Sequence, residues 1–297
     1  MAIQREVWVQ DIVENLFPSN LFSNYATNHD GFVVEGRVVH QPYAGAKPTV
    51  VKDRTTLPAT VTTRVDLDLT YTLAEYSTDP VTLRNAEKFE LSYDKRMSLL
   101  GEHIAALRDR IHADLLQAWL GTASALGALP SGNLIATSGV LENGKRKLAL
   151  ADLLRVKQEM DRRNIPDEGR YLLFPAELHN ELFSIDEVVQ AELLGRATLP
   201  EGVVSQLLGF NILKRGSTVV YDGAGALRPF GAVPAPTDRL AVVAWSRYSV
   251  ARALGEVNLY ESTDDPLYYG DIYSASVRAG GTRLRNDGVY ALVQATS

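Results

Sequence analysis

The sequence contains no cysteine in its 297 residues. This absence excludes disulfide bonds, thiolate zinc sites, iron–sulfur clusters and a cysteine nucleophile. Long apolar runs are also absent, since none approaches the roughly 18 residues that a membrane-spanning helix needs. The first residues include Glu6, Asp11 and Glu14, where a signal peptide would stay apolar. We therefore expect a chain that is made in the cytoplasm, has no membrane partner, and is stabilised by packing or assembly.

Positive charge is in short supply. The chain has 30 Lys and Arg residues against 36 Asp and Glu residues, which gives a formal net charge of −6. A protein that grips nucleic acid needs an excess of basic residues to release counterions from the phosphates, so strong DNA binding is not expected to be the main task. The basic cluster at 145–147 adjoins a turn and is interpreted as a solvated loop.

Catalytic motifs are missing as well. No serine lies in a G-x-S-x-G pattern, no H-E-x-x-H occurs, and the scattered histidines lack the spacing of metal ligands. Two carboxylate pairs, Asp66 with Asp68 and Asp264 with Asp265, could in principle form an acid/base or metal couple. The polar face of a strand explains the first pair, and a turn before Pro266 explains the second. We expect no catalytic residue, no metal and no cofactor.

One stretch, GVLENGKR at 139–146, matches the phosphate-binding pattern G-x-x-x-x-G-K. The next position of that pattern needs Ser or Thr to hold Mg²⁺ and carries Arg146 instead, and Glu142 would place a carboxylate where backbone amides should meet phosphate. An Asn-Gly reversal between two elements is the favoured interpretation. A nucleotide-binding enzyme that uses this loop stays open as a distant alternative.

The first feature that is present is a β-rich region over 32–78. Apolar residues alternate with polar ones along its second half, which is typical of a strand with one face to cover: Val61, Val65, Leu67, Leu69, Tyr71 and Leu73. The connecting stretch PYAGAKPTVVKDRTTLP holds little that could form a core. Because an isolated two-stranded hairpin is marginal in water, we expect the distal part of this hairpin to lie on a neighbouring chain.

A long helix is predicted over about 83–120. Its apolar residues recur at steps of three and four and form one stripe: Tyr93, Met97, Leu100, Ile104, Leu107, Ile111 and Leu115. At about 1.5 Å per residue the helix would span on the order of 50 Å. Such a length exceeds what a compact domain usually holds.

The remainder of the chain mixes short elements, and the fold class is α+β. In NIPDEGRYLLFPAELHNELF at 164–183, a continuous apolar run predicts a strand buried on both faces, followed by a helix with Pro175 in its first turn. Four tyrosines are assigned to an interface or to the core: Tyr260, Tyr268, Tyr269 and Tyr273. Further elements are predicted as a strand at 134–137, a helix over 148–164, an acidic helix over 184–195, short strands and turns over 202–223, a turn at 262–266, and two final strands with a tight reversal at 286–288.

The order of these elements resembles that of the HK97-type major capsid proteins of tailed bacteriophages. The most specific part is the unit from Gly169 to Leu178, which looks like the family's strand-then-proline-helix unit; GVVSQLLGFNILKRGS at 202–217 looks like its glycine-strand-glycine pattern. The resemblance implies five regions: an N-terminal arm (1–31), an extended β-hairpin called the E-loop (32–78), the spine helix and peripheral domain (79–165), the axial domain (166–245) and return strands of the peripheral domain (246–297).

The resemblance also implies a function. It implies a structural protein, not an enzyme, that assembles into hexamers and pentamers in the host cytoplasm and forms the icosahedral shell of the virion around a phage genome. The implied partners are further copies of the chain, a separate scaffolding protein, a portal, decoration proteins and double-stranded DNA held weakly on the inner face. An encapsulin-type nanocompartment shell stays open as an alternative. Intersubunit contacts are expected from Lys52, Asp53, Arg54, Asp66 and Asp68.

Overall fold

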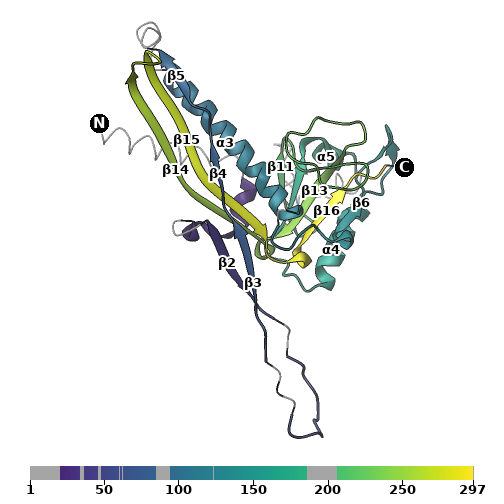
Figure 1. The fold of residues 1–297 in the computed structure, drawn as a ribbon. Helices are drawn as coiled ribbons and strands as arrows, with labels where there is room; N and C mark the ends of the chain where they lie inside the picture. The colour runs from purple at the N-terminus through teal and green to yellow at the C-terminus, as the bar shows by residue number, and fades with distance from the viewer. Residues whose placement is uncertain are drawn as a thin grey trace.

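The chain folds into a long limb joined to a wider head, and a hairpin extends from the place where they meet (Figure 1). The limb consists of helix α3 and the strand pair β14–β15, with β1, β4 and β5 beside them. The head consists of a second sheet with helices α4 and α5. The computed structural model describes residues 21–33, 37–45, 48–59, 61, 63–84, 94–122, 124–185 and 206–296.

The limb is a five-stranded sheet with one helix along it. The strands β14 and β15 are antiparallel; β1 lies at one edge, and both β4 and β5 pair with β15 at the other. Helix α3 covers one face of this sheet, where Ile104, Leu107 and Ile111 form a core with residues such as Val257 and Val277. The bounds are β1 Thr27–Asn28, β4 Ala74–Ser77, β5 Val81–Arg84, α3 Asp94–Leu120, β14 Val250–Asp265 and β15 Gly270–Arg283.

The predicted apolar stripe of the long helix is confirmed over its described part, where Ile104, Leu107, Ile111 and Leu115 are buried. The predicted start near residue 83 is wrong. Leu83 lies in β5, opposite Asp271 of β15, because its side chain is buried in the core of the limb sheet. The helix of 27 residues begins at Asp94, so its length is about 40 Å at 1.5 Å per residue. Tyr93 lies outside the described residues, as do the side chains of Met97 and Leu100.

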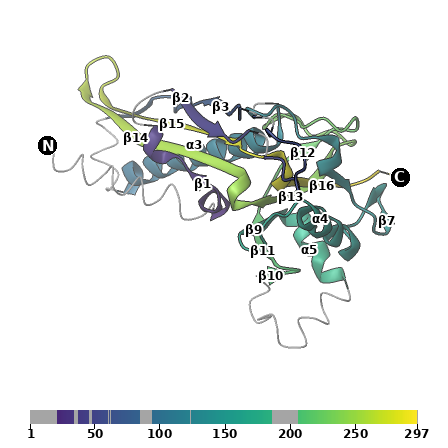
Figure 2. The ribbon, with the colours of Figure 1, turned by 90° about the horizontal axis from the view of Figure 1, so that it is seen from below.

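The head is built on a seven-stranded sheet of order β10-β11-β9-β13-β16-β6, with β12 paired to β13. All six residues of β9 are buried, which confirms the predicted strand covered on both faces. Its side chains alternate between two cores: Leu172 and Phe174 pack with α4 and α5, whereas Tyr171 and Leu173 pack with Trp119 near the end of α3. Figure 2 shows α4 and α5 together on one side of this sheet. The bounds are β6 Leu134–Ala136, α4 Leu150–Arg162, β9 Arg170–Pro175, α5 Ala176–Glu181, β10 Gln206–Leu207, β11 Phe210–Arg215, β12 Val220–Tyr221, β13 Arg239–Ser246 and β16 Val289–Val293.

The stretch 139–146 forms a small hairpin, not a phosphate-binding loop. Strands β7 Leu141–Glu142 and β8 Lys145–Arg146 pair across Asn143 and Gly144, whose φ angles are 51° and 75°. Two positive φ values suit the Asn-Gly turn of a hairpin. The ammonium group of Lys147 forms an ion pair with Glu142, and α4 begins only at Leu150. The Asn-Gly reversal is therefore confirmed, and a phosphate would find no helix start behind this loop.

Two predicted turns need correction. Strand β14 continues through Ser262–Asp265, and the turn comprises residues 266–269, because β15 supplies pairing partners for Ser262 and Asp265. The reversal at 286–288 is the short 3-10 helix Asn286–Gly288, but the strands on either side of it lie in different sheets and do not pair. Residues 1–20 of the predicted arm and 186–195 of the predicted acidic helix lie outside the described residues. In the described part no helix is long and apolar enough to cross a membrane.

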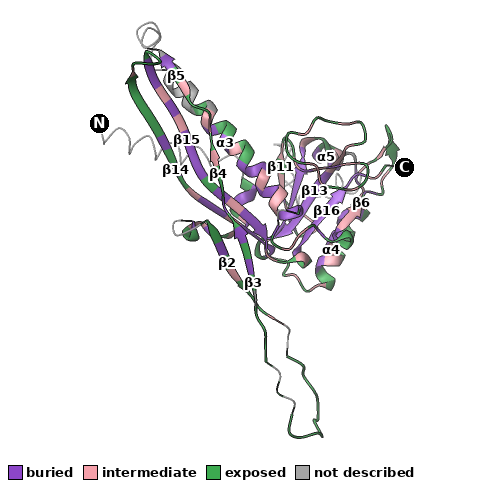
Figure 3. Cartoon of the chain, viewed as in Figure 1, coloured by how far each residue is buried: buried purple, intermediate pink, exposed green. Residues whose placement is uncertain are grey.

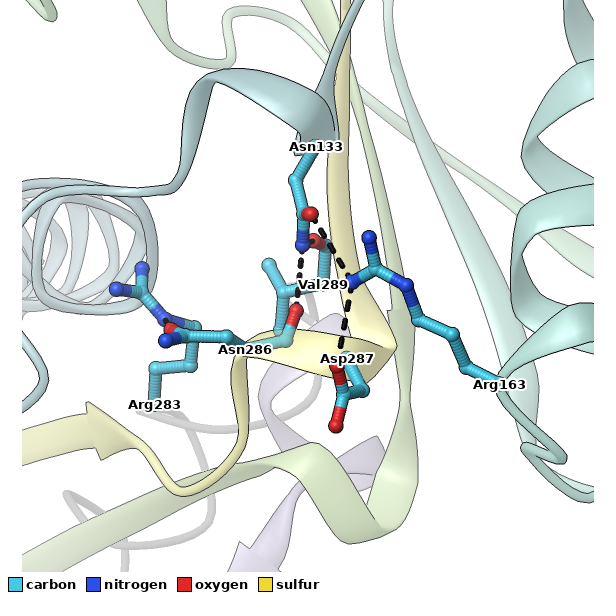
Figure 4. A network of polar contacts seen from close by, with 6 residues as sticks. All are labelled: Asn133, Arg163, Arg283, Asn286, Asp287 and Val289. Carbon is cyan, nitrogen blue, oxygen red and sulfur yellow. Dashed lines mark hydrogen bonds and ion pairs between the residues drawn. The ribbon is translucent and has the colours of Figure 1, made fainter.

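The crossing at 286–288 is where a polar network joins limb and head (Figure 4). Arg283 is fully buried and donates from Nη1 to the carbonyl of Trp119 at 2.6 Å and from Nε to Oδ1 of Asn286 at 2.7 Å. Asn133 donates from Nδ2 to the carbonyl of Val289 at 2.7 Å. Since buried polar groups without partners are costly, this network fixes the limb relative to the head.

Five short 3-10 segments complete the described backbone besides the one at 286–288. Those at the start of the described chain bring Phe22 and His29 against the limb and its junction with the head. The segments are Leu21–Tyr25, Asp30–Phe32, Ser131–Asn133, Leu182–Ser184 and Arg247–Ser249.

Candidate assembly interface

The hairpin β2–β3 is anchored at its base. Strands Val38–Tyr43 and Leu67–Thr72 pair antiparallel, and Val39 and Tyr71 are buried with Leu73 against the limb residue Ala253. The hydroxyl of Tyr71 lies 2.9 Å from Nδ1 of His29. Burial of Tyr71 raises the pKa of its hydroxyl, so the group stays protonated at neutral pH. The base of the hairpin is thus a fixed part of the limb.

Polar contacts hold the two chains of the hairpin together just beyond the base. Nδ1 of His40 lies 2.6 Å from Oδ2 of Asp68. The backbone N–H of Gly45 donates to Oδ1 of Asp66 at 2.9 Å, and Arg64 donates to the same oxygen. The hydrogen bond from Gly45, together with that from Arg64, lowers the pKa of Asp66. The two aspartates therefore bond within their own hairpin, which agrees with the structural interpretation of this pair.

The distal part of the hairpin lies in solvent. Between β2 and β3 the described residues form no strand, and Figure 3 shows this stretch as exposed. Val61 is 93% exposed and Val65 71%, whereas Leu69 is only 7% exposed. The predicted strand over 60–73 is therefore regular only from Leu67, because the alternating residues before it have no second layer to pack against. As expected, the apolar face is covered only near its base.

The predicted contact residues occupy two separate places on the hairpin. Lys52, Asp53 and Arg54 are exposed at its far end, where Asp53 has a φ of 50° in the turn. Asp66 and Asp68 lie near the base instead. Sequence reasoning missed the support given by Arg285, whose guanidinium stacks 5.9 Å from the ring centre of Tyr43. No local sequence signal could have joined residues so far apart along the chain.

Of the four tyrosines assigned to core or interface, one is buried and three are exposed. Tyr273 is 2% exposed, and its hydroxyl donates to Oδ2 of Asp271 at 3.1 Å. The other three, Tyr260, Tyr268 and Tyr269, are at least half exposed. Tyr268 and Tyr269 lie with the exposed Leu267 in the turn between β14 and β15. The limb thus ends in an exposed apolar and aromatic surface.

One buried histidine lies where α3, the segment Leu21–Tyr25 and the head meet. His112 is 2% exposed, its Nδ1 donates to the carbonyl of Arg108 at 2.7 Å, and its ring meets Phe22 edge-on at 5.5 Å. Burial lowers the pKa of His112 to about 4, and the charges of Arg215, Arg108 and Arg252 act in the same direction. The hydrogen bond to the Arg108 carbonyl opposes this shift only in part.

The lowered pKa of His112 predicts that the subunit loses stability in acid. The unfolded chain binds a proton at this residue below about pH 6.5, whereas the folded chain does so only below about pH 4. The contribution of His112 to the free energy of unfolding is therefore fully present above pH 6.5. Roughly 3 kcal/mol of it is lost as the pH falls to 4. Urea unfolding of wild type and His112→Gln between pH 7 and 4 should give a shallower pH dependence for the variant. The same pH dependence of the unfolding free energy in both proteins would contradict the lowered pKa of His112.

Solved structures with a similar fold include phage capsids. The capsid of cyanophage P-SCSP1u superposes with a TM-score of 0.67 at 19% identity, covering 92% of this chain and 87% of that chain. A structure of Mycobacterium phage Che8 gives a TM-score of 0.62 at 17% identity and covers 91% and 90%. The mature capsid of bacteriophage PhiM1 gives 0.62 at 13% identity and covers 87% and 82%. The fold is therefore the HK97-type capsid fold, with an extended hairpin and a long spine helix.

A comparison of the sequence with family models identifies the family. The sequence model of the family described as phage capsid protein matches residues 51–265, which include the hairpin tip, α3 and most of the head. No curated protein matches the chain at a significant level. The chain belongs to the phage capsid protein family. It is a structural protein of the virion shell, and this match favours the phage shell over the nanocompartment alternative.

Proposed function

We propose that the chain builds its shell by laying the distal part of the hairpin across a neighbouring copy, so that subunits join into rings of five and six that close into an icosahedral capsid. One observation carries this proposal. Aliphatic side chains line the distal hairpin in solvent, where no described part of the same chain covers them: Val50, Val51, Leu57, Val61 and Val65. Burying them against another subunit would recover the hydrophobic free energy that the isolated subunit forgoes.

The region boundaries and the remaining partners belong to the same proposal. The limb would be the peripheral domain and the head the axial domain. The head includes β6, α4 and β16, so the expected boundaries near 165 and 245 do not divide the two. Assembly would take place in the host cytoplasm with a separate scaffolding protein and a portal. The net charge of −6 favours weak contact between the inner face and packaged double-stranded DNA, because few basic residues are free to release counterions.

A capsid role without catalysis is also proposed. Its support is the geometry of 139–146, where the one nucleotide-like pattern forms the β7–β8 hairpin. Within the described residues no group of His, Asp and Glu has the arrangement of a metal site.

Electron microscopy of the purified chain tests the proposed assembly. The expected result is rings and closed shells, formed by the chain alone or after addition of its scaffolding protein, because the apolar hairpin surface gains by association at high concentration. Mass photometry gives the mass of the rings in the same samples. Only monomers at high protein concentration, with and without the scaffold, would contradict the proposal.

A further inference from the structure

The limb sheet carries a hollow on the face that α3 does not cover. Its volume is about 590 Å³, and Val33 lines it beside Gly255. Leu254 and Val257 border it too, but their side chains belong to the core under α3. The charged and aromatic groups that line it are Asp30, Glu75, Glu256, Arg278 and Tyr260. Three carboxylates thus face one guanidinium, and the hollow is acidic.

The sheet shapes this hollow through a bulge in β14. The pairing with β15 shifts register between Leu254 and Val257, so that Gly255 and Glu256 together face the single residue Arg278 and β14 carries one extra residue. A Cβ atom on Gly255 would lie 2.7 Å from Cγ1 of Val33 and 2.9 Å from the carbonyl oxygen of Arg278, so the close approach requires glycine. On the adjacent strands Arg278 pairs in register with Glu75.

Two of the three carboxylates are available to a partner. Asp30 is occupied, because it accepts from the backbone N–H of Leu254 at 2.8 Å and lies 3.6 Å from Arg252. Glu75 is exposed and meets Arg278 only at 3.8 Å. Glu256 is exposed and has no hydrogen bond or ion pair with any described residue. The hollow therefore offers uncompensated negative charge on the surface of the limb.

The hairpin tip has the complementary composition. Val50 is 91% exposed and Val51 51%, and both directly precede Lys52. Lys52 and Arg54 are exposed, and neither forms an ion pair with a described residue. Two exposed cations on the tip thus match the two available carboxylates of the hollow.

The hairpin tip cannot bind the hollow of its own chain. The hollow lies at the base of the hairpin, since Val33 lines it and also packs with Val39 and Tyr71. About ten extended residues separate this base from the tip, or roughly 33 Å, and Figure 1 shows the tip pointing away from the limb. Complementary surfaces on separate parts of one chain join copies head to tail, and such contacts form a ring when the rotation between copies closes.

We propose that the hollow is the receptor for the hairpin tip of the next copy, with Lys52 and Arg54 facing Glu75 and Glu256. The inference rests on the proposed function, because it names the surface on which the distal part of the hairpin would lie. It goes further in fixing which faces meet and in making the contact directional around the ring.

Charge reversal tests this pairing. A tip variant carries Lys52→Glu with Arg54→Glu, a hollow variant carries Glu75→Lys with Glu256→Lys, and a third chain carries all four changes. Like charges in contact disfavour the wrong pairing strongly, so each two-site variant should yield fewer shells by more than about tenfold. The four-site chain should recover most of them. An equimolar mixture of tip and hollow variants should also form rings of six, because alternating copies restore opposite charges at every contact.

Two controls separate the possible outcomes. The reversal Glu168→Lys, at an exposed site in the head, should assemble as wild type does. Circular dichroism should show every variant folded, because all the changed side chains are exposed. Normal shells from the hollow variant, or no recovery in the four-site chain, would overturn the pairing. If the replacement of residues 44–58 also left assembly intact, the proposal that the hairpin joins subunits would be wrong. If that replacement abolished assembly, only the assignment of the hollow as the binding site of the tip would be wrong.

Discussion

Replacing residues 44–58 by a short Gly-Ser turn is expected to give a folded subunit that cannot close a shell. The described residues of the replaced stretch take no part in the cores of limb or head, and Val50 and Leu57 are 91% and 77% exposed. The buried contacts at the hairpin base, such as that between Tyr71 and His29, remain. Thermal unfolding should therefore be close to that of wild type, while the intersubunit contact is lost.

Size-exclusion chromatography and electron microscopy of this variant measure the loss directly. A matched control replaces the exposed turn Asn143-Gly144 of the β7–β8 hairpin by Gly-Gly, which introduces flexibility elsewhere and keeps glycine at the positive φ of position 144. This control should assemble normally. Shells of ordinary size and stability from the 44–58 variant would show that the distal hairpin does not join neighbouring subunits.

The substitution Leu107→Asp is expected to prevent soluble folding. Leu107 is 5% exposed on α3 and packs in the limb core with residues such as Ile111 and Val277. An unpaired carboxylate in such a core costs several kcal/mol, a large part of a total stability of roughly 5–15 kcal/mol. We expect most of the protein in the insoluble fraction, and a strongly lowered melting temperature for any soluble remainder.

The chain offers a matched control on another helix. Leu154 of α4 is 46% exposed, so Leu154→Asp makes the same chemical change where water can still hydrate the carboxylate. Its soluble yield and melting temperature should stay near those of wild type. A normal yield and melting point for Leu107→Asp would mean that the stripe of α3 is not a core face.

Local patterns were enough wherever a residue's neighbours in sequence decide its structure. The step of three and four residues placed Ile104, Leu107 and Ile111 on one buried face of a helix, because 3.6 residues make a turn. The Asn143-Gly144 pair predicted a reversal, because these residues adopt positive φ at low cost. The apolar run before Pro175 likewise predicted a strand buried on both faces.

By itself, then, the sequence determined the class of fold, the long amphipathic helix and a hairpin whose distal half lacks a cover. Only the tertiary structure decided that Leu83 is a strand residue, that Arg283 ties limb to head, and that Gly255 opens an acidic hollow beside Val33. The physical reason is the range of the interactions. Periodicity and turn preference act within a few residues, whereas these positions depend on pairings across many residues of chain, such as Thr27 with Ala251, which no local pattern specifies.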